Sequence, residues 1–467
     1  MRKIISTMTM TLAVMLTASA QQQQTTQTVQ QDFSRPCGLY TADSGKGFDF
    51  IDSPAEASSI SGKSKAVPSK PVYFSANVPD GNYRVTLVLG SKQRPADTWV
   101  RAESRRLMLQ SVKTKKGELR TVSFVVNKRT PEIYQNTPVA QNTRNTQNTQ
   151  SLQSSPIQKA PVAKVKIKPG EVGSLTWDDK LTLEFCGAAP AVQSVRIEPD
   201  TTAVTLFLCG NSTVVDQGRE PWASWGQMFP RWFNDKVCVA NYGESGLTAA
   251  SFLAQLRLDK ILSEIKPGDY VFCEFGHNDE KEKGPGRGAW YHYSVGLKTF
   301  IDRVREKGGN IIFCTPTVRR FFENDGTIRN THGDFPAAMK AVAEREQVPV
   351  IDLNAMTKTL FEAMKPEGSK NLLVHYPAGT FPWQEKEFAD NTHFNPFGAY
   401  EVSKLIVMGL KQMQSPLVQY LVADWQDFNP ANPSVQPSDG VFPAPEVHQY
   451  FPWPESIFND NRKPDGN

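Results

Sequence analysis

Residues 205–213 read TLFLCGNST, and this stretch decides the fold. A short, continuous apolar run that ends at a glycine is typical of a buried strand in a parallel sheet. In open α/β sheets, ligands bind beyond the carboxyl ends of such strands. Ser212 lies two residues after Gly210, so we expect its hydroxyl at the edge where chemistry takes place. An isolated serine in this position is equally typical of a helix N-cap. Whether Ser212 is a nucleophile or a cap therefore depends on the other residues that the sequence places beside it.

Around this stretch, strand and helix patterns alternate from residue 202 to about residue 413. The expected strands are 203–209, 237–241, 270–275, 310–315 and 348–352. The expected helices are 225–234, 249–264, 295–307, 335–346 and 398–413. Such alternation indicates an α/β domain with a parallel sheet and helices on both faces.

Residues 36–197 have a different, all-β pattern. Short alternating or β-branched runs occur at 72–78, 83–90, 99–109, 119–126 and 181–186, with turn residues between them. We therefore expect a β-sandwich of the galactose-binding-like kind. Within it, residues 135–160 are rich in Asn, Gln, Thr and Ser and have no apolar period, which predicts a disordered insertion. The Gln/Thr-rich residues 21 to about 35 are also expected to lack structure.

The two ends of the chain have their own signals. Residues 1–20 have the pattern of a secretory signal peptide, since Arg2 and Lys3 precede an apolar run that ends in small residues. No later stretch approaches the roughly 20 apolar residues that span a bilayer. We therefore expect an exported protein, periplasmic or secreted, without a membrane span. The Pro- and aromatic-rich residues 414–467 are expected to drape over the catalytic domain.

Composition narrows the function further. A chain of 467 residues suggests two domains. Its formal charge of +4 comes from scattered Lys and Arg, so we expect no nucleic-acid partner.

Four of the six cysteines lie in apolar strand-like runs and are expected to be buried thiols: Cys209, Cys238, Cys273 and Cys314. Cys37 and Cys186 lie near the two ends of the all-β region, where they would either form a disulfide or remain free.

Three later blocks supply partners for Ser212. They are NYGESGLT at 241–248 after the second strand, FGHND at 275–279 after the third, and DNTH at 390–393 before the last helix. They place Gly243, Asn278, Asp390 and His393 at the same sheet edge. A hydroxyl, an imidazole and a carboxylate with fixed N–H donors are what serine acyl transfer needs. Histidine takes the serine proton near neutral pH, and each donor to the oxyanion contributes roughly 10²–10³ in rate.

The order of these blocks resembles the SGNH (GDSL) hydrolase family over nearly all of residues 203–413. The finer resemblance is to rhamnogalacturonan acetylesterases, through GNST (for their GDST), WGQMFP at 225–230, NTHGDFP at 330–336 and DNTHFN at 390–395. The resemblance implies a flavodoxin-like sheet and removal of acetyl groups from a pectic backbone of rhamnose and galacturonate. We expect no metal or cofactor, because His277-Asn278-Asp279 has no second cluster of ligands and the hydrolytic set is complete without an ion.

Carried over residue by residue, the resemblance makes Ser212 the nucleophile, His393 the base and Asp390 its orienting acid. The oxyanion hole then consists of the backbone N–H groups of Ser212 and Gly243 and the side chain of Asn278. One position departs from the family pattern, since Asn211 stands where the family has Asp. Asn keeps the shape of the Asp side chain but removes a charge beside the site. We therefore expect the protein to be active, with a rate and a pH profile that the missing charge alters.

Several other side chains have a functional and a purely structural interpretation. Contacts to substrate are considered for Trp222, His332 and Trp383, and for Arg319 and Arg320, which suit uronate carboxylates. The alternative for the arginines and His332 is simple solvation. Trp99 and Trp177 either stack on sugars or pack in the core, and the core is the stronger expectation. His277 is expected to be structural, and Ser245 fails the spacing of a nucleophile elbow because Leu247 occupies the last position.

Two further functions compete with the pectic acetylesterase. The first is an esterase of the same fold that acts on acetylated xylan or on a lipid. The second, from another class, is a polysaccharide-binding protein whose catalytic domain has decayed. Asn211 is the only sequence feature in favour of decay, and the intact Ser, Asp and His set argues against it.

Overall fold

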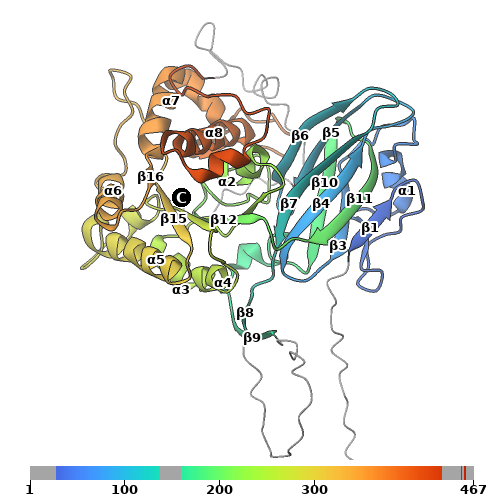
Figure 1. Cartoon of the computed structure of the whole chain (residues 1–467). Helices are drawn as coiled ribbons and strands as arrows, with labels where there is room; N and C mark the ends of the chain where they lie inside the picture. The colour runs from blue at the N-terminus through green and yellow to red at the C-terminus, as the bar shows by residue number, and fades with distance from the viewer. Residues whose placement is uncertain (1–27, 137–158, 434–453, 455–456, 459–467) are drawn as a thin grey trace, which may run out of the picture.

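One nine-stranded sheet runs through both halves of the chain (Figure 1). The computed structural model describes residues 28–136, 159–433, 454 and 457–458. Its strand order is β1-β11-β4-β7-β13-β12-β14-β15-β16. The parallel part consists of β13 (Val237–Asn241), β12 (Val204–Gly210), β14 (Tyr270–Glu274), β15 (Asn310–Cys314) and β16 (Val350–Ile351). The antiparallel part consists of β1 (Val29–Asp32), β11 (Val192–Pro199), β4 (Gly81–Leu89) and β7 (Arg120–Lys128).

The two parts of this sheet meet where β7 pairs in parallel with β13, with Val125 opposite Cys238 and Val126 opposite Val239. An unpaired sheet edge exposes backbone N–H and C=O groups, and this pairing covers the edge of β13. The N-terminal half is therefore joined to the catalytic half through backbone hydrogen bonds and not only through side chains.

Helices cover both faces of the parallel part (Figure 1). One face carries α2 (Trp225–Met228), α7 (Leu353–Gly368) and α8 (Pro396–Gln412), and the other carries α3 (Ala249–Ala254), α4 (Arg257–Leu262), α5 (Ser294–Glu306) and α6 (Phe335–Glu346). The strands are buried on both faces, so their apolar runs are continuous. This mixed α/β arrangement with a central parallel sheet confirms the expected fold class of the catalytic half.

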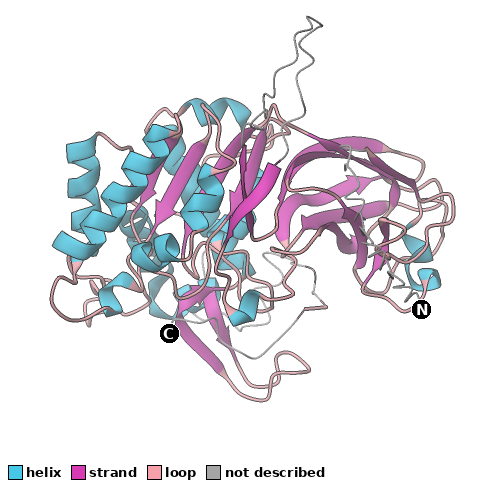
Figure 2. Cartoon of the chain, turned by 90° about the horizontal axis from the view of Figure 1, so that it is seen from below, coloured by secondary structure: helices cyan, strands magenta, loops and turns pink. Residues whose placement is uncertain are grey.

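A second sheet packs on the antiparallel part (Figure 2). Its order is β2 (Lys46–Asp49), β3 (Val72–Asn77), β10 (Lys180–Ala189), β5 (Ala96–Ala102) and β6 (Arg106–Thr114). A buried apolar cluster fills the space between the sheets, with Phe74 and Leu183 from one and Val85 and Ile197 from the other. The short helix α1 (Pro54–Ala57) adds Ala57 to this cluster.

Two hairpins lie outside these sheets. One pairs β8 (Glu132–Asn136) with β9 (Lys159–Lys164), and the other pairs β17 (Leu373–Tyr376) with β18 (Phe388–Phe394). The predicted insertion at 135–160 thus begins and ends within strands, and its residues 137–158 lie outside the described residues. The predicted signal at 1–20 also lies outside them.

Several element predictions were wrong in detail. The expected strand 99–109 is two strands, because Glu103 and Arg105 have φ values of 53° and 62° and reverse the chain between β5 and β6. The expected helix 249–264 is two helices, because Leu256 takes a left-handed φ of 62° between α3 and α4. Residues 29–32, expected to lack structure, form β1.

The tip of the β5–β6 turn reaches into the catalytic half. The Arg105 guanidinium donates to the carbonyl oxygens of Gln217 and Trp222, at 3.0 and 3.2 Å. The carbonyl of Ser104 accepts from Gln227 on α2 at 2.8 Å. Because these side chains are buried, each bond replaces one that water would otherwise make. The all-β half thereby holds the loop 217–222 of the catalytic half in place.

The described tail contacts both halves, whereas the prediction placed it on the catalytic domain alone. Trp425 packs edge-on against Trp232, with ring centroids 5.1 Å apart, on the catalytic half. Phe458 packs against Phe50 of the all-β half at 5.2 Å, and Arg101 donates to the carbonyl of Pro454 at 2.9 Å.

The remaining expectations concern burial. All six cysteines are free, so Cys37 and Cys186 do not form the disulfide that was left open, and the other four are buried as expected. Trp99 and Trp177 are 3% and 6% exposed, which confirms that both pack in the core.

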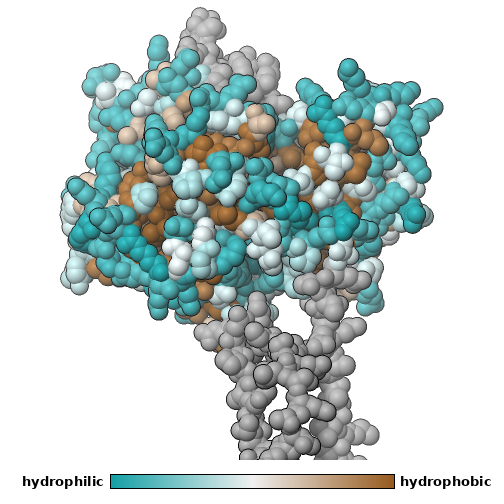
Figure 3. Space-filling model, viewed as in Figure 1, coloured by the Kyte–Doolittle hydropathy of each residue, from teal (hydrophilic) through white to brown (hydrophobic). Residues whose placement is uncertain are grey.

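The face of the molecule in Figure 3 is mainly hydrophilic, with apolar groups gathered in patches over each half. Within the described part of the chain, no helix is both long and apolar enough to cross a bilayer.

Candidate active site

Ser212, His393 and Asp390 form one hydrogen-bonded chain. The Nε2 atom of His393 lies 2.9 Å from the Ser212 hydroxyl oxygen, and its Nδ1 atom lies 2.8 Å from an oxygen of Asp390. Ser212 lies two residues beyond the end of β12, and both partners belong to β18. As predicted, they come just before the helix that Asn395 caps, α8, although they form a strand that the prediction did not include. The side chains are 6%, 1% and 3% exposed, so the chain of bonds is shielded from water.

The Asp390 carboxylate is held as an anion. Burial alone would raise its pKa, but the hydrogen bond and charge of His393, with the backbone N–H groups of His393 and Thr392, lower this pKa well below its usual range. Those N–H groups donate to the second carboxylate oxygen at 3.1 and 2.9 Å. An ionised carboxylate only accepts, so Nδ1 of His393 carries the proton and Nε2 is left to accept from the Ser212 hydroxyl.

The expected oxyanion donors lie in the loops that follow β12, β13 and β14. The backbone N–H of Ser212 has no acceptor among the described residues. One N–H of the Asn278 amide donates to the carbonyl of Leu247 at 3.1 Å, which orients the amide and leaves its second N–H available. The N–H of Gly243 donates to the side-chain oxygen of Asn241 at 3.1 Å, so a substrate oxyanion would share this N–H. These three N–H groups remain the donors that we expect to bind the oxyanion.

Side chains from the all-β half support the Gly243 donor. Arg106 of β6 pairs with one oxygen of Asp216 at 3.0 Å, and the other oxygen accepts from the amide of Asn241 at 2.9 Å. Asn241 in turn holds the N–H of Gly243. All these side chains are buried, so their positions are strongly coupled. The sequence blocks did not identify Arg106 or Asp216, because neither lies in a strand-end motif.

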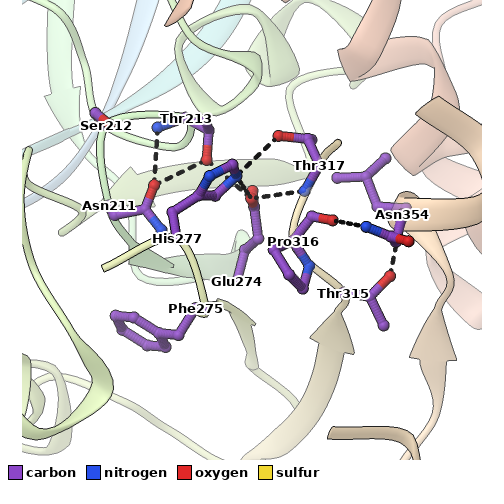
Figure 4. A network of polar contacts seen from close by, with 12 residues as sticks. Asn211, Ser212, Thr213, Glu274, Phe275, His277, Thr315, Pro316, Thr317 and Asn354 are labelled. Carbon is purple, nitrogen blue, oxygen red and sulfur yellow. Dashed lines mark hydrogen bonds and ion pairs between the residues drawn. The ribbon is translucent and has the colours of Figure 1, made fainter. Parts of the chain in front are cut away.

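Next to Ser212 lies a buried polar network that contains Asn211, the residue that departs from the family pattern (Figure 4). The Asn211 side-chain oxygen accepts from the N–H and the hydroxyl of Thr213, at 3.1 and 2.9 Å. The same hydroxyl lies 2.8 Å from Glu274, whose other oxygen accepts from the indole N–H of Trp225 at 2.5 Å. The amide nitrogen of Asn211 has no partner among the described residues. Glu274, at the end of β14, was missed by sequence reasoning.

Burial raises the pKa of Glu274 from 4.5 to about 7, against the opposing hydrogen bonds of Trp225, Thr213 and Thr317. A protonated Glu274 donates to the Thr213 hydroxyl, which then donates its own proton to Asn211. With the bonds in this direction, the hydroxyl of protonated Glu274 and the hydroxyl of Thr213 each donate their single proton to one acceptor. Asn211 thus takes part in a network that carries no charge in acidic solution.

We expect the Glu274→Gln variant to flatten the pH dependence of stability. Between pH 4.5 and 7 the folded protein keeps a proton on Glu274 that the unfolded chain has lost, so stability falls as the pH rises through this window. A pKa change from 4.5 to about 7, at about 1.4 kcal/mol for each pH unit, corresponds to roughly 3 kcal/mol. Glutamine reproduces the protonated acid, because its oxygen accepts from Trp225 and its amide donates to Thr213.

This prediction is checked by urea unfolding at pH 5 and pH 8. The free energy of unfolding of the variant should fall less between these pH values than that of the parent protein, by an amount on the order of 3 kcal/mol. Glu385→Gln, a change at an exposed carboxylate, serves as the control. Equal slopes for the parent and for Glu274→Gln would show that Glu274 is ionised in the folded protein throughout.

The Asn211→Asp variant tests the departure from the family pattern. Its new carboxylate would share the Thr213 hydroxyl with Glu274, and two neighbouring acids do not both ionise readily. We expect activity to stay within about tenfold of the parent. The acid limb of the kcat/KM profile should move to higher pH, since a nearby negative charge stabilises the protonated imidazole. If the rate and the pH profile of the variant both equalled those of the parent, the charge at position 211 would not affect catalysis.

The imidazoles near the site serve the structure. His277 is 2% exposed, and its Nε2 atom lies 3.1 Å from the Thr317 hydroxyl. Burial and the neighbouring His332 and Arg319 lower the pKa of His277 well below its usual value, so it is neutral. This agrees with the structural role expected for it. His332 is 2% exposed and bonds to Glu280 at 2.7 Å, which places it inside the protein and not in an open polar loop.

The other residues considered for substrate contact are also largely internal. Arg319 pairs with Glu280 at 2.6 Å, and Arg320 donates to Asn391 at 3.1 Å. Trp383 is half-buried and stacks on Phe381, with centroids 5.1 Å apart. Trp222 is 1% exposed, and its indole nitrogen has no partner in the part of the chain that the structure describes.

Comparison with known proteins matches the catalytic half. The model of the GDSL-like Lipase/Acylhydrolase family matches residues 208–399. Rhamnogalacturonan acetylesterase RhgT of Bacillus subtilis (strain 168) is 41% identical over 222 residues, which cover 47% of this chain and 95% of that protein. The probable rhamnogalacturonan acetylesterase YesY of the same organism is 30% identical over 222 residues, or 47% of this chain and 98% of its own.

A more distant relative is the rhamnogalacturonan acetylesterase of Emericella nidulans, which is 27% identical over 46% of this chain and 87% of its own length. Among solved structures, the crystal structure of protein YxiM from Bacillus subtilis is similar over 84% of this chain and 99% of that chain. It has 23% sequence identity and a TM-score of 0.43.

Proposed function

Because the chain belongs to the rhamnogalacturonan acetylesterase-like branch of the GDSL (SGNH) hydrolase family, and is thus a carboxylic-ester hydrolase, we propose that it removes acetyl groups from pectic rhamnogalacturonan. The relatives support a carbohydrate acetylesterase, and the pectic substrate is the finer part of the proposal. One observation supports the mechanism most strongly: the unbroken chain of hydrogen bonds from Ser212 through His393 to Asp390.

In the proposed mechanism, Ser212 attacks the carbonyl carbon of the acetyl ester while Nε2 of His393 takes the hydroxyl proton. The new C–O bond converts the carbonyl into an oxyanion, which accepts from the N–H groups of Ser212, Gly243 and Asn278. Collapse of this intermediate breaks the ester bond, and His393 returns the proton to the leaving sugar hydroxyl. Ser212 is then acetylated.

Deacylation repeats these steps with water. His393 takes a proton from the water molecule as its oxygen attacks the acetyl carbon, and the oxyanion is stabilised by the same donors. The Ser212–acetyl bond then breaks, acetate leaves, and the proton returns to the serine oxygen. Asp390 keeps its negative charge throughout and stabilises the imidazolium that forms in each half of the cycle.

The proposal also covers the rest of the chain. The two packed antiparallel sheets with a shared apolar core support a β-sandwich of the galactose-binding-like kind for the all-β half. The residue pattern at 1–20 supports export to the periplasm or the medium. Both assignments agree with a protein that meets plant polysaccharide outside the cytoplasm.

Acetate release from acetylated rhamnogalacturonan, beside acetylated xylan and a lipid ester, tests the substrate class. We expect a kcat/KM on the pectic polymer at least about tenfold above that on xylan, since a site built for particular sugar hydroxyls discriminates against others. Release from xylan or from the lipid ester alone would retain the esterase and reject the pectic assignment. Binding of polysaccharide without any acetate release would favour the decayed, binding-only alternative.

A further inference from the structure

A cleft with a volume of about 580 Å³ lies between the two halves and begins beside the oxyanion donor Gly243. Its catalytic-side wall includes Gln217, whose amide donates to the backbone carbonyl of Ser212 at 3.0 Å. Its opposite wall is the segment 169–178, which connects β9 to β10 in the all-β half. Volumes of this order are typical of sites that hold small ligands. The cleft is therefore adjacent to the nucleophile without containing it.

Among the buried polar atoms on the walls of this cleft that have no hydrogen-bond partner in the described part of the chain, two could pair with a sugar. They are the hydroxyl oxygen of Ser174, from the all-β half, and the indole nitrogen of Trp222, from the catalytic half. A buried polar group without a partner costs about 1–3 kcal/mol, so such groups are rare unless a ligand or water satisfies them. A sugar hydroxyl both donates and accepts, and it can therefore pair with either atom.

The walls of the cleft carry charged groups of both signs, Asp178 among the carboxylates, and a uronate would meet cations there as well as carboxylates. Two of the carboxylates, Glu171 and Asp216, are paired with Arg257 and Arg106. Glu244 is different, because burial and the nearby Glu171 raise its pKa to about 8, so it is protonated at neutral pH. Of the cations that line the cleft, Arg105 pairs with Glu220 at 3.2 Å and Lys180 pairs with Asp49 at 2.7 Å, and Arg219 lines it as well. An arginine or lysine on such a wall attracts a uronate carboxylate.

We propose that this cleft between the halves is a substrate subsite, which holds the uronate-containing sugar units that flank the acetylated one. The proposal rests on the function proposed above and adds that the all-β half forms part of the active site. It also gives that half a role that RhgT does not share, since the matched 222 residues already account for 95% of that protein. The subsite makes polymeric esters better substrates than isolated acetyl esters.

Two variants on the all-β wall test the subsite. A Cβ atom added at Gly170 meets no atom within 4 Å, and its backbone is not left-handed, so Gly170→Phe adds a ring to open space without strain. We expect this ring to raise KM for acetylated rhamnogalacturonan by roughly tenfold or more, since it takes volume that a sugar would occupy. Ser174→Ala should raise that KM about two- to tenfold, the effect of one lost hydrogen bond.

The matched control is Gly38→Phe, because Gly38 also offers open space and lies outside the cleft. Each protein is assayed on the polymer and on p-nitrophenyl acetate, which lacks the flanking sugar units that the subsite would hold. The subsite predicts an unchanged kcat/KM on p-nitrophenyl acetate for all three variants, with losses on the polymer only for the two cleft variants.

The outcomes separate the two proposals. Equal KM values on the polymer for the parent, Gly170→Phe and Ser174→Ala would overturn the subsite and leave the acetylesterase intact. A parent protein that hydrolyses p-nitrophenyl acetate but none of the acetylated polymers would overturn the polysaccharide function, and the subsite with it. Equal losses on both substrates in a cleft variant would show a general disturbance of the fold and would contradict a subsite at that residue.

Discussion

The Ser212→Ala variant is expected to lose acetate release by roughly 10⁴–10⁶-fold in kcat, the largest effect of any single change in this chain. The hydroxyl that lies 2.9 Å from Nε2 of His393, and that we expect this nitrogen to deprotonate, is then absent. Acetate release is measured on acetylated rhamnogalacturonan under saturating conditions. KM should change little, because the lost group acts in the transition state.

The control for this experiment is Ser263→Ala, which removes a hydroxyl whose one bond among the described residues goes to the carbonyl of Lys260 on α4. Both variants should unfold at temperatures close to that of the parent protein, so a selective loss of activity in the first identifies the nucleophile. A Ser212→Ala protein that kept more than about a hundredth of the parent kcat would contradict the proposed mechanism.

The Asp390→Asn variant should lower kcat by about 10⁴-fold. In this variant the remaining side-chain oxygen would keep the N–H groups of Thr392 and His393, and the new amide would face Nδ1 of His393. Nδ1 must then accept, so the imidazole proton moves to Nε2, which no longer accepts the proton of Ser212. The variant changes no volume, and its fold should be intact.

This result is checked by comparing kcat with the chemical shifts of the two ring nitrogens of His393. Loss of activity with the proton transferred to Nε2 supports the role assigned to Asp390. Full activity in the variant, or inactivity with the proton still on Nδ1, would show that Asp390 does not act by orienting the imidazole.

The sequence predicted the residues of the site better than it predicted their surroundings. Ser212 and Gly243 lie directly after apolar strands, so local patterns place them at the sheet edge without long-range information. Glu274 also ends a strand, but its importance depends on the distant Trp225 and Thr213, which only the fold brings to it. The catalytic roles of these residues remain predictions that the variants test.

Long-range pairing explains most of what the sequence did not reveal. Nothing in the pattern of β7 indicates that Val125 would lie opposite Cys238, more than a hundred residues away. The joined sheet and the buried Arg105 contacts between the halves were therefore unexpected. Likewise β18 was not recognised as a strand, because its sequence FADNTHF has polar residues where a buried strand would be apolar.

The most direct test of the central claim is covalent labelling with an alkyl fluorophosphonate, followed by mass spectrometry of the digested protein. Such reagents react with a serine that a histidine activates, and they form a stable adduct on its oxygen. The account predicts one adduct per chain, on Ser212, formed more slowly when acetylated rhamnogalacturonan is present and in the Asp390→Asn variant. An adduct on Ser245 with Ser212 unlabelled, or full acetate release after Ser212 is labelled, would contradict it.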